Sequence, residues 1–190
     1  MSIAARAFLI TFSAFLLLIP AAAAAEPASA QLFATRATAQ LFATRATALD
    51  GKAITLEGYK GKALIVNFWA RWCGPCRKEL PDLAALYEKY RDKGLIVLGV
   101  ALEDADYRTS VSEFAAAYGV GYPVVLVGAS SGVGLMRSLG NDKGGVPFTL
   151  TIAPDGRILT KKLGAMNAEE MESAAAALFG QPASRSALRN

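Results

Sequence analysis

The stretch FWARWCGPCRKELP, from Phe68 to Pro81, contains Cys73 and Cys76, the only two cysteines among 190 residues. Two thiols three residues apart can act as a redox pair, supply half of a metal site, or form a short structural disulfide. The residues around the pair distinguish between these roles, and the choice decides both the fold and the chemistry.

The metal and structural roles are both disfavoured. Zinc takes four protein ligands in structural sites and three in catalytic ones, whereas this chain has two cysteines and no histidine. A metal site would require converging carboxylates, or two chains that share four thiols, so we expect no metal-binding residues. A structural disulfide stabilises more as its loop lengthens, and the loop between Cys73 and Cys76 is nearly the shortest possible.

The redox role fits the position of the cysteines between a strand and a helix. Ala63–Trp69 is an apolar run typical of a strand that is buried on both faces. From Cys73 to Arg91 apolar residues recur every three or four positions, which predicts a helix that Pro81 should kink. Unpaired backbone N–H groups at the start of this helix would stabilise a Cys73 thiolate. Cys76 lies one turn later on the same face, within reach of a mixed disulfide.

Three neighbouring residues indicate where a second chain would approach the cysteines. Gly74 allows a close approach of another backbone, and Pro75 suits the first turn of a helix, where its missing N–H has no intrahelical partner. Trp72 would offer an incoming chain a flat apolar surface, or would instead pack in the core. We therefore expect thiol–disulfide exchange, with Trp72, Gly74 and Pro75 on the side of the substrate.

Patterns typical of strands and helices alternate beyond this segment. The predicted elements are a strand over Leu95–Ala101, a helix over Ser110–Tyr118, a strand from Tyr122, a short helix over Ser131–Leu139, a hairpin that begins at Pro147, and a helix over Ala168–Phe179. This order predicts an α/β fold with a mixed central sheet flanked by helices.

A duplicated nonapeptide precedes this region. The unit QLFATRATA occurs at Gln31–Ala39 and again at Gln40–Ala48, and two copies are too few for a solenoid. The second copy runs into the turn signal Asp50-Gly51, so we expect Phe42–Ala48 to pair with Ala53–Leu56 as a hairpin. The first copy has no obvious partner and is expected to be a mobile linker.

The first residues have the pattern of a secretory signal. Arg6 precedes an apolar run over Ala7–Ile19, and small residues follow Pro20. The alternative is an uncleaved membrane anchor, since the alanines after Pro20 extend the run to a marginal length for a membrane span. Export would place the cysteine pair where disulfides persist.

The expected organisation is therefore a signal peptide over 1–25, a linker over 26–41, one folded domain over 42–180 and a flexible tail over 181–190. The formal charge is +4 and the basic residues are scattered. No run of like charges marks a nucleic-acid footprint, so we expect no nucleic-acid partner.

The motif FWARWCGPC resembles the active-site motif of thioredoxin-fold oxidoreductases. The wider stretch GKALIVNFWARWCGPCRKELP, preceded by LDGKAITLEGYKGK, resembles the exported TlpA/ResA-like branch. The resemblance runs from about Phe42 to Phe179. It implies a thioredoxin-like fold with an N-terminal β-hairpin and with an inserted helix–strand unit over Glu103–Leu126.

The resemblance also implies further site residues. Val146-Pro147 matches a cis-proline loop that lies against the cysteine pair and offers the Val146 backbone to a substrate strand. Glu79 matches an active-site glutamate that would handle protons at Cys76, although its position equally fits a solvated helix charge. Asn67 stands where cytosolic thioredoxins have a buried aspartate, so proton transfer would fall to Glu79 or to water.

These observations predict an exported thiol–disulfide oxidoreductase in which Cys73 attacks and Cys76 resolves, with no cofactor besides this dithiol. The Gly-Pro pair between the cysteines resembles reducing members, which favours reduction of disulfides in exported proteins. The resemblance suggests a role in cytochrome c maturation or copper-site assembly, with a membrane-bound thiol carrier as electron donor. A disulfide oxidase or isomerase is the alternative, and a non-catalytic thiol metal carrier or docking module is the alternative from another class.

Overall fold

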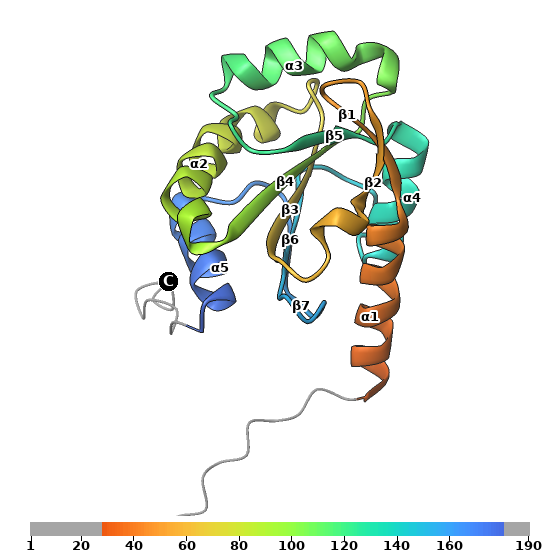
Figure 1. Cartoon of the computed structure of the whole chain (residues 1–190), viewed down its shortest axis with the longest axis vertical. Coiled ribbons are helices and arrows are strands. Elements are labelled where there is room, and N and C mark those ends of the chain that lie inside the picture. The colour runs from red at the N-terminus through yellow and green to blue at the C-terminus, as the bar shows by residue number, and fades with distance from the viewer. Residues whose placement is uncertain (1–27, 181–190) are drawn as a thin grey trace, which may run out of the picture.

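The computed structural model describes residues 28–180, which form a seven-stranded mixed sheet with helices on both faces (Figure 1). The strand order is β2-β1-β5-β4-β3-β6-β7. The strands are β1 (Arg45–Ala48), β2 (Ala53–Thr55), β3 (Ala63–Trp69), β4 (Leu95–Ala101), β5 (Val124–Leu126), β6 (Phe148–Ile152) and β7 (Ile158–Leu163). The predicted α/β class and mixed sheet are confirmed.

The strand β3 lies inside the sheet, between β4 and β6. All seven of its residues are buried, and it pairs with β4 in parallel and with β6 in antiparallel orientation. Asn67 lies opposite Gly99 on one side and Thr149 on the other. The strand ends at Trp69, a few residues before Cys73.

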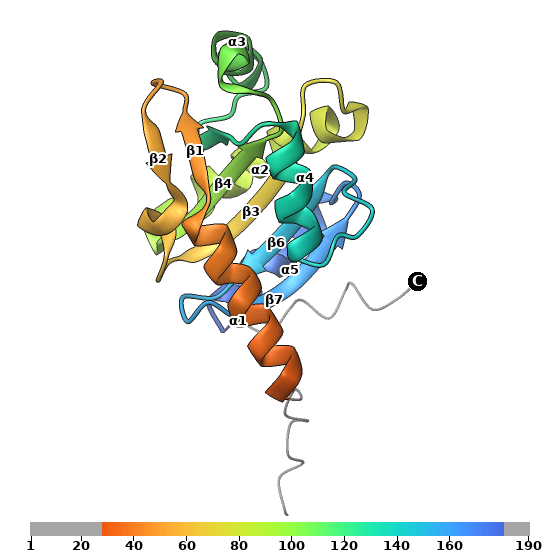
Figure 2. The same ribbon diagram turned by 90° about the vertical axis from the view of Figure 1, so that its right-hand side faces the viewer.

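Two helices cover each face of the sheet. The helices α2 (Gly74–Tyr90) and α5 (Ala168–Leu178) contact one another on one face, and α1 (Ala28–Ala43) and α4 (Ala129–Ser138) lie together on the other, as Figures 1 and 2 show. The helix α3 (Arg108–Ala117) and strand β5 form the predicted helix–strand unit between β4 and α4. Short 3₁₀ turns complete the connections at η1 (Leu56–Tyr59), η2 (Arg91–Lys93) and η3 (Ala105–Tyr107).

The helix that follows the active-site loop begins and ends as its sequence predicts. Cys73 is the N-cap residue of α2, with extended backbone angles, and Pro75 lies in the first turn. The helix continues through Pro81. After η2 the chain leaves the helical path at Gly94, whose φ of 91° is accessible to glycine at little cost.

The C-terminal hairpin and helix also agree with the prediction. The strands β6 and β7 pair in antiparallel orientation, and the turn between them is closed by the Gly156 N–H, which donates to the Ala153 carbonyl at 2.8 Å. The final helix α5 starts with a capping box, in which Asn167 and Glu170 each bind the other's backbone N–H.

The predicted linker over 26–41 is wrong for the residues that the structure describes. The helix α1 covers the first copy of the nonapeptide and the first four residues of the second, and the strand expected from Phe42 begins only at Arg45. Ala37, Leu41 and Phe42 are buried in the core, and α1 packs against η1 and α4. The folded unit therefore starts before residue 42.

Identical sequences have different structures in the two copies of the repeat. Arg-Ala-Thr-Ala is helical at 36–39 and forms β1 at 45–48. In the second copy Ala46 pairs with Ile54 of β2 and Thr47 pairs with Leu126 of β5, whereas the first copy is helical throughout and takes no part in the strand pairing. Tertiary contacts decide the outcome where local propensity is the same.

No helix within residues 28–180 is long and apolar enough to cross a bilayer. The expected signal peptide over 1–25 and the expected tail over 181–190 lie outside the described residues.

Candidate active site

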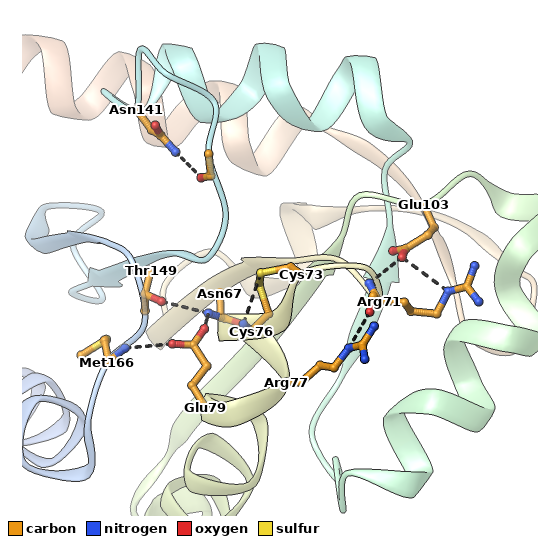
Figure 3. The surroundings of a disulfide bond; sticks show 11 residues. Asn67, Arg71, Cys73, Cys76, Arg77, Glu79, Glu103, Asn141, Thr149 and Met166 are labelled. Atoms are coloured by element: carbon orange, nitrogen blue, oxygen red, sulfur yellow. Dashed lines mark hydrogen bonds and ion pairs between the residues drawn. A yellow bond between two sulfur atoms is a disulfide. The ribbon is translucent and has the colours of Figure 1, made fainter.

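Cys73 and Cys76 form a disulfide at the start of α2, directly beyond the carboxyl end of β3. Their Cα atoms are 5.3 Å apart. The backbone N–H of Cys76 donates to Sγ of Cys73 at 3.2 Å (Figure 3), so this sulfur occupies the place of an N-cap acceptor. In the dithiol form a thiolate at this position is stabilised by the N–H groups of the first helical turn.

The surface around the disulfide is open to a second chain. Trp72 is 70% exposed, so the alternative that it packs in the core is wrong. A Cβ added at Gly74 would meet no atom within 4 Å, which leaves free space in front of the helix start. Cys73 retains 4% exposure and Cys76 has none, so Cys73 is the sulfur nearer to solvent.

Glu79 is a buried carboxyl one turn after Cys76. It is only 2% exposed, so the alternative of a solvated helix charge is wrong. Its Oε1 accepts a hydrogen bond of 2.8 Å from Asn67 Nδ2, and its Oε2 accepts one of 2.9 Å from the Met166 N–H. Burial raises the pKa of Glu79, and the hydrogen bonds from Met166 and Asn67 oppose this rise only in part.

Asn67 connects Glu79 to the neighbouring strand. Its Nδ2 also donates to Thr149 Oγ1 at 2.9 Å, while its Oδ1 is buried without a hydrogen-bond partner among the described residues. Tyr122 lies in the same electrostatic environment, because burial and the charge of Glu79 both raise the pKa of its phenol. Glu79 and Tyr122 therefore lie in an interior region where burial disfavours their ionised forms.

The Val146–Pro147 peptide bond is cis and precedes β6. Phe148 pairs with Phe68 of β3, which places Pro147 at the same end of the sheet as the loop that leads to Cys73. The Pro147 carbonyl accepts a hydrogen bond of 2.9 Å from the Gly164 N–H. Val146 is half-buried and Pro147 is buried.

The loop before Pro147 is held by Asn141. This side chain is 3% exposed, and its Nδ2 donates to the Gly145 carbonyl at 2.8 Å (Figure 3). The role of Asn141 is not evident from the sequence, because an asparagine in a glycine-rich loop is a common turn signal and does not by itself indicate a tertiary contact.

Three further features are not evident from the sequence, namely the contact of Asn67 with Thr149, the contact of Glu79 with the Met166 backbone, and the burial of Glu103. Thr149 becomes a partner of Asn67 only through the register of β3 and β6, and Met166 contributes its backbone, which no side-chain pattern reveals. Glu103 is 8% exposed and accepts a hydrogen bond of 2.7 Å from the Arg71 N–H. Its position directly after a buried strand was the available signal.

Within residues 28–180 no group of three or more cysteine, aspartate or glutamate side chains is placed to hold a metal ion. The site combines the Cys73–Cys76 disulfide with the buried Glu79 carboxyl, which lies one helical turn after Cys76. This arrangement can exchange electrons through the sulfurs and protons through the carboxyl.

Comparisons with known proteins agree with this chemistry. The Redoxin family model matches residues 30–178. The chain is 33% identical over 124 residues to the thiol-disulfide oxidoreductase ResA of Bacillus thuringiensis strain Al Hakam, which covers 65% of this chain and 68% of that protein. It is also 33% identical over 117 residues to ResA of Bacillus subtilis strain 168, with 62% of each chain covered.

Solved structures show the same fold. A thioredoxin family thiol:disulfide interchange protein from Chlorobium tepidum has a TM-score of 0.59 and 26% identity, covering 72% of this chain and 95% of that one. StoA from Bacillus subtilis has a TM-score of 0.53 and 27% identity, covering 68% of this chain and 93% of that one. With a thioredoxin-like sheet and a Cys-Gly-Pro-Cys disulfide at the start of its second helix, the chain belongs to the Redoxin family as a ResA-like thiol-disulfide oxidoreductase.

Proposed function

We propose that this enzyme is exported and reduces disulfides of other exported proteins, with Cys73 as the attacking thiol and Cys76 as the resolving thiol. The observation that carries the proposal is the hydrogen bond from the Cys76 N–H to Cys73 Sγ at the start of α2. A thiolate at this position is stabilised while it stays within reach of a second sulfur on the same helical turn.

The reaction transfers two electrons from the dithiol to the substrate. The Cys73 thiolate attacks one sulfur of the substrate disulfide, and the other substrate sulfur leaves as a thiolate that takes up a proton. The Cys76 thiol then loses its proton and attacks Cys73 Sγ in the mixed disulfide. This second step releases the reduced substrate and forms the Cys73–Cys76 disulfide.

Glu79 accepts the proton of Cys76 in the second step. Both residues belong to α2 and lie one turn apart, and Figure 3 places Glu79 close to the helix start. A carboxyl with a raised pKa is a stronger base than an ordinary glutamate, which suits proton transfer from a thiol near neutral pH. Its hydrogen bonds to Asn67 and Met166 keep it oriented through the cycle.

The substrate lies across the surface formed by Trp72, Gly74 and Pro75 on one side and by Val146 and Pro147 on the other. Trp72 offers an exposed aromatic face, and Gly74 leaves room for a second backbone. The Val146 backbone hydrogen-bonds to an extended substrate segment, which pairs with it as a strand would.

The N-terminal sequence pattern supports the proposed export, and the similarity to ResA supports the proposed pathway. The leader-like residues 1–25 would direct the enzyme out of the cytosol, to the periplasm or another extracytoplasmic space. The enzyme contacts the membrane only if this segment remains uncleaved. We propose cytochrome c maturation or copper-site assembly as the setting, with a membrane-bound thiol carrier that returns the disulfide to the dithiol form.

Insulin reduction and the reduction potential of the purified enzyme test the proposed direction. A reductase should accelerate insulin precipitation in the presence of dithiothreitol, and its potential should be close to that of thioredoxin, at about −270 mV. A potential well above about −150 mV would instead assign the enzyme to oxidation of protein thiols. Absence of turnover together with stoichiometric metal binding would assign it to metal transport.

A further inference from the structure

A buried carboxylate that the proposed mechanism does not use lies beside the active-site loop. Glu103 follows β4, and its Oε1 accepts the Arg71 N–H at 2.7 Å and lies 3.4 Å from Arg71 Nε. Its Oε2 is buried and has no hydrogen-bond partner among the described residues. A carboxylate buried with one unpartnered oxygen is costly, and the short contact with the Arg71 backbone is the strongest interaction that offsets the cost.

The register of the sheet brings Glu103 to this loop. β3 and β4 run in parallel with Trp69 opposite Ala101, and the Leu102 N–H donates to the Trp69 carbonyl at 3.0 Å. Arg71 lies two residues after Trp69, and Glu103 lies two residues after Ala101. The two loops therefore leave the sheet side by side.

The Arg77 side chain binds the other backbone polar group of Arg71. Arg77, in the first turns of α2, donates from Nε to the Arg71 carbonyl at 2.9 Å (Figure 3). Both backbone polar groups of Arg71 are thus bound, its N–H by Glu103 and its C=O by Arg77. The loop closes with the Cys73 N–H, which donates to the Ala70 carbonyl at 3.1 Å.

The hydrogen bonds that hold the Arg71 backbone also affect Cys73. The Sγ atom accepts the Cys76 N–H at 3.2 Å, a contact that exists only while the residue before the helix keeps its place. A shift of the loop would withdraw the sulfur from the helix start and raise its pKa. The negative charge of Glu103 also disfavours a nearby thiolate, and the Arg71 and Arg77 charges favour one.

We propose that Glu103 is a positioning residue for the attacking thiol, acting through the Arg71 peptide to hold Cys73 at the start of α2. The inference rests on the proposed role of Cys73. It also gives the inserted unit a function at the active site, since the Arg71 guanidinium lies 5.4 Å from the Tyr107 ring centre in η3. Two substitutions separate position from charge, because only the one that withdraws the acceptor from the Arg71 N–H is expected to slow alkylation of Cys73.

Glu103→Asp keeps the charge but shortens the side chain by one methylene, which withdraws the acceptor from the Arg71 N–H. Glu103→Gln keeps the acceptor oxygen and removes the charge. Both are made in the full-length chain with Cys76→Ser, and the pH dependence of iodoacetamide alkylation of Cys73 is measured. We expect Glu103→Asp to raise the Cys73 pKa and slow alkylation at pH 7 at least about threefold. Glu103→Gln should leave the rate unchanged or increase it by up to about fivefold.

Glu113 on α3 is exposed, and Glu113→Asp and Glu113→Gln serve as matched controls that should change nothing. Thermal unfolding of each variant identifies any loss of the fold. Glu103→Gln is decisive even if Glu103→Asp does not fold, because a threefold slower alkylation in Glu103→Gln overturns the proposal. Unchanged alkylation in a folded Glu103→Asp also overturns it. If Glu103→Asp slows alkylation and Glu103→Gln does not, while the parent enzyme fails to reduce insulin, the positioning role stands and the proposed reductase function is wrong.

Discussion

Asn67 Nδ2 donates a hydrogen bond of 2.8 Å to Glu79 Oε1 in the interior of the domain. A titratable aspartate at position 67 would compete with Glu79 for the proton, whereas an amide can only orient it. Because Met166 holds the other carboxyl oxygen at 2.9 Å, Glu79 is fixed in one orientation. The carboxyl of Glu79 is therefore held in the interior beside an amide that cannot titrate, and burial raises its pKa.

Glu79→Gln tests the role of this carboxyl in turnover. The variant keeps most of the side-chain volume but accepts no proton, so release of substrate from the mixed disulfide should slow about a hundredfold. The initial attack by Cys73 should change much less. Rapid-mixing kinetics with a disulfide-containing peptide separate the two steps, and equal slowing of both would contradict the assignment of Glu79 to the second step.

The same residue makes stability depend on pH. Since the folded-state pKa of Glu79 is raised, its contribution is fully present below the unfolded-state pKa and is lost as pH rises through the folded-state pKa. The free energy of unfolding of the oxidised enzyme should fall over this window, by about 1.4 kcal/mol for each unit between the two pKa values. Glu79→Gln should lack this fall, and Glu113→Gln should retain it.

Asn67→Asp should place two carboxyls in contact in the core. Two carboxyls at this distance cannot both ionise readily, so the pKa for loss of the second proton from the pair rises above that of Glu79 in the parent enzyme. We expect the variant to lose about 2–4 kcal/mol of stability at pH 8 and much less at pH 5, measured by urea unfolding. Thr149→Val removes the other acceptor of Asn67 without adding a charge, and it should not steepen the pH dependence. An equal loss at both pH values in Asn67→Asp would argue against the pairing of charges.

Trp72→Ala tests the substrate surface. The side chain is 70% exposed, so its removal should change the free energy of unfolding by less than about 0.5 kcal/mol. The value of kcat/KM for a protein disulfide should fall about tenfold, which corresponds to loss of one aromatic contact. Reduction of a small disulfide such as hydroxyethyl disulfide, which does not span the surface, should be unaffected. A parallel fall for both substrates would place the effect at Cys73 itself.

The predicted core of the fold depended on strong local signals, and the structure follows them. The apolar run at β3 and the turn at Ala153–Gly156 each specify one local structure. The cysteine pair could be placed at a helix start because Pro75 and the preceding strand fix that boundary. These elements need little information from the rest of the chain.

The features that the sequence does not predict depend on contacts between distant segments. Glu79 is bound by the Met166 backbone and by Asn67, which also donates to Thr149 of β6. Glu103 reaches Arg71 only because β3 and β4 are in register. The two copies of QLFATRATA carry the same local information, so sequence alone could not show that one continues as helix and the other becomes strand.

Leu41→Ala tests whether α1 is part of the folded unit. Leu41 is 1% exposed in the core cluster, and its truncation should cost about 2–5 kcal/mol of stability, measured by chemical denaturation. Arg45 is exposed, and Arg45→Ala serves as the control with a change below about 0.5 kcal/mol. A Leu41→Ala variant as stable as the parent would restore the interpretation of this segment as a linker.

Trapping of mixed disulfides tests the assignment of the two sulfurs most directly. The reduced Cys76→Ser variant is mixed with a disulfide-bonded protein, and covalent complexes are counted by non-reducing electrophoresis. If Cys73 attacks and Cys76 resolves, this variant accumulates a stable complex and the matched Cys73→Ser variant does not. Accumulation of the complex by Cys73→Ser, with none by Cys76→Ser, would contradict the account.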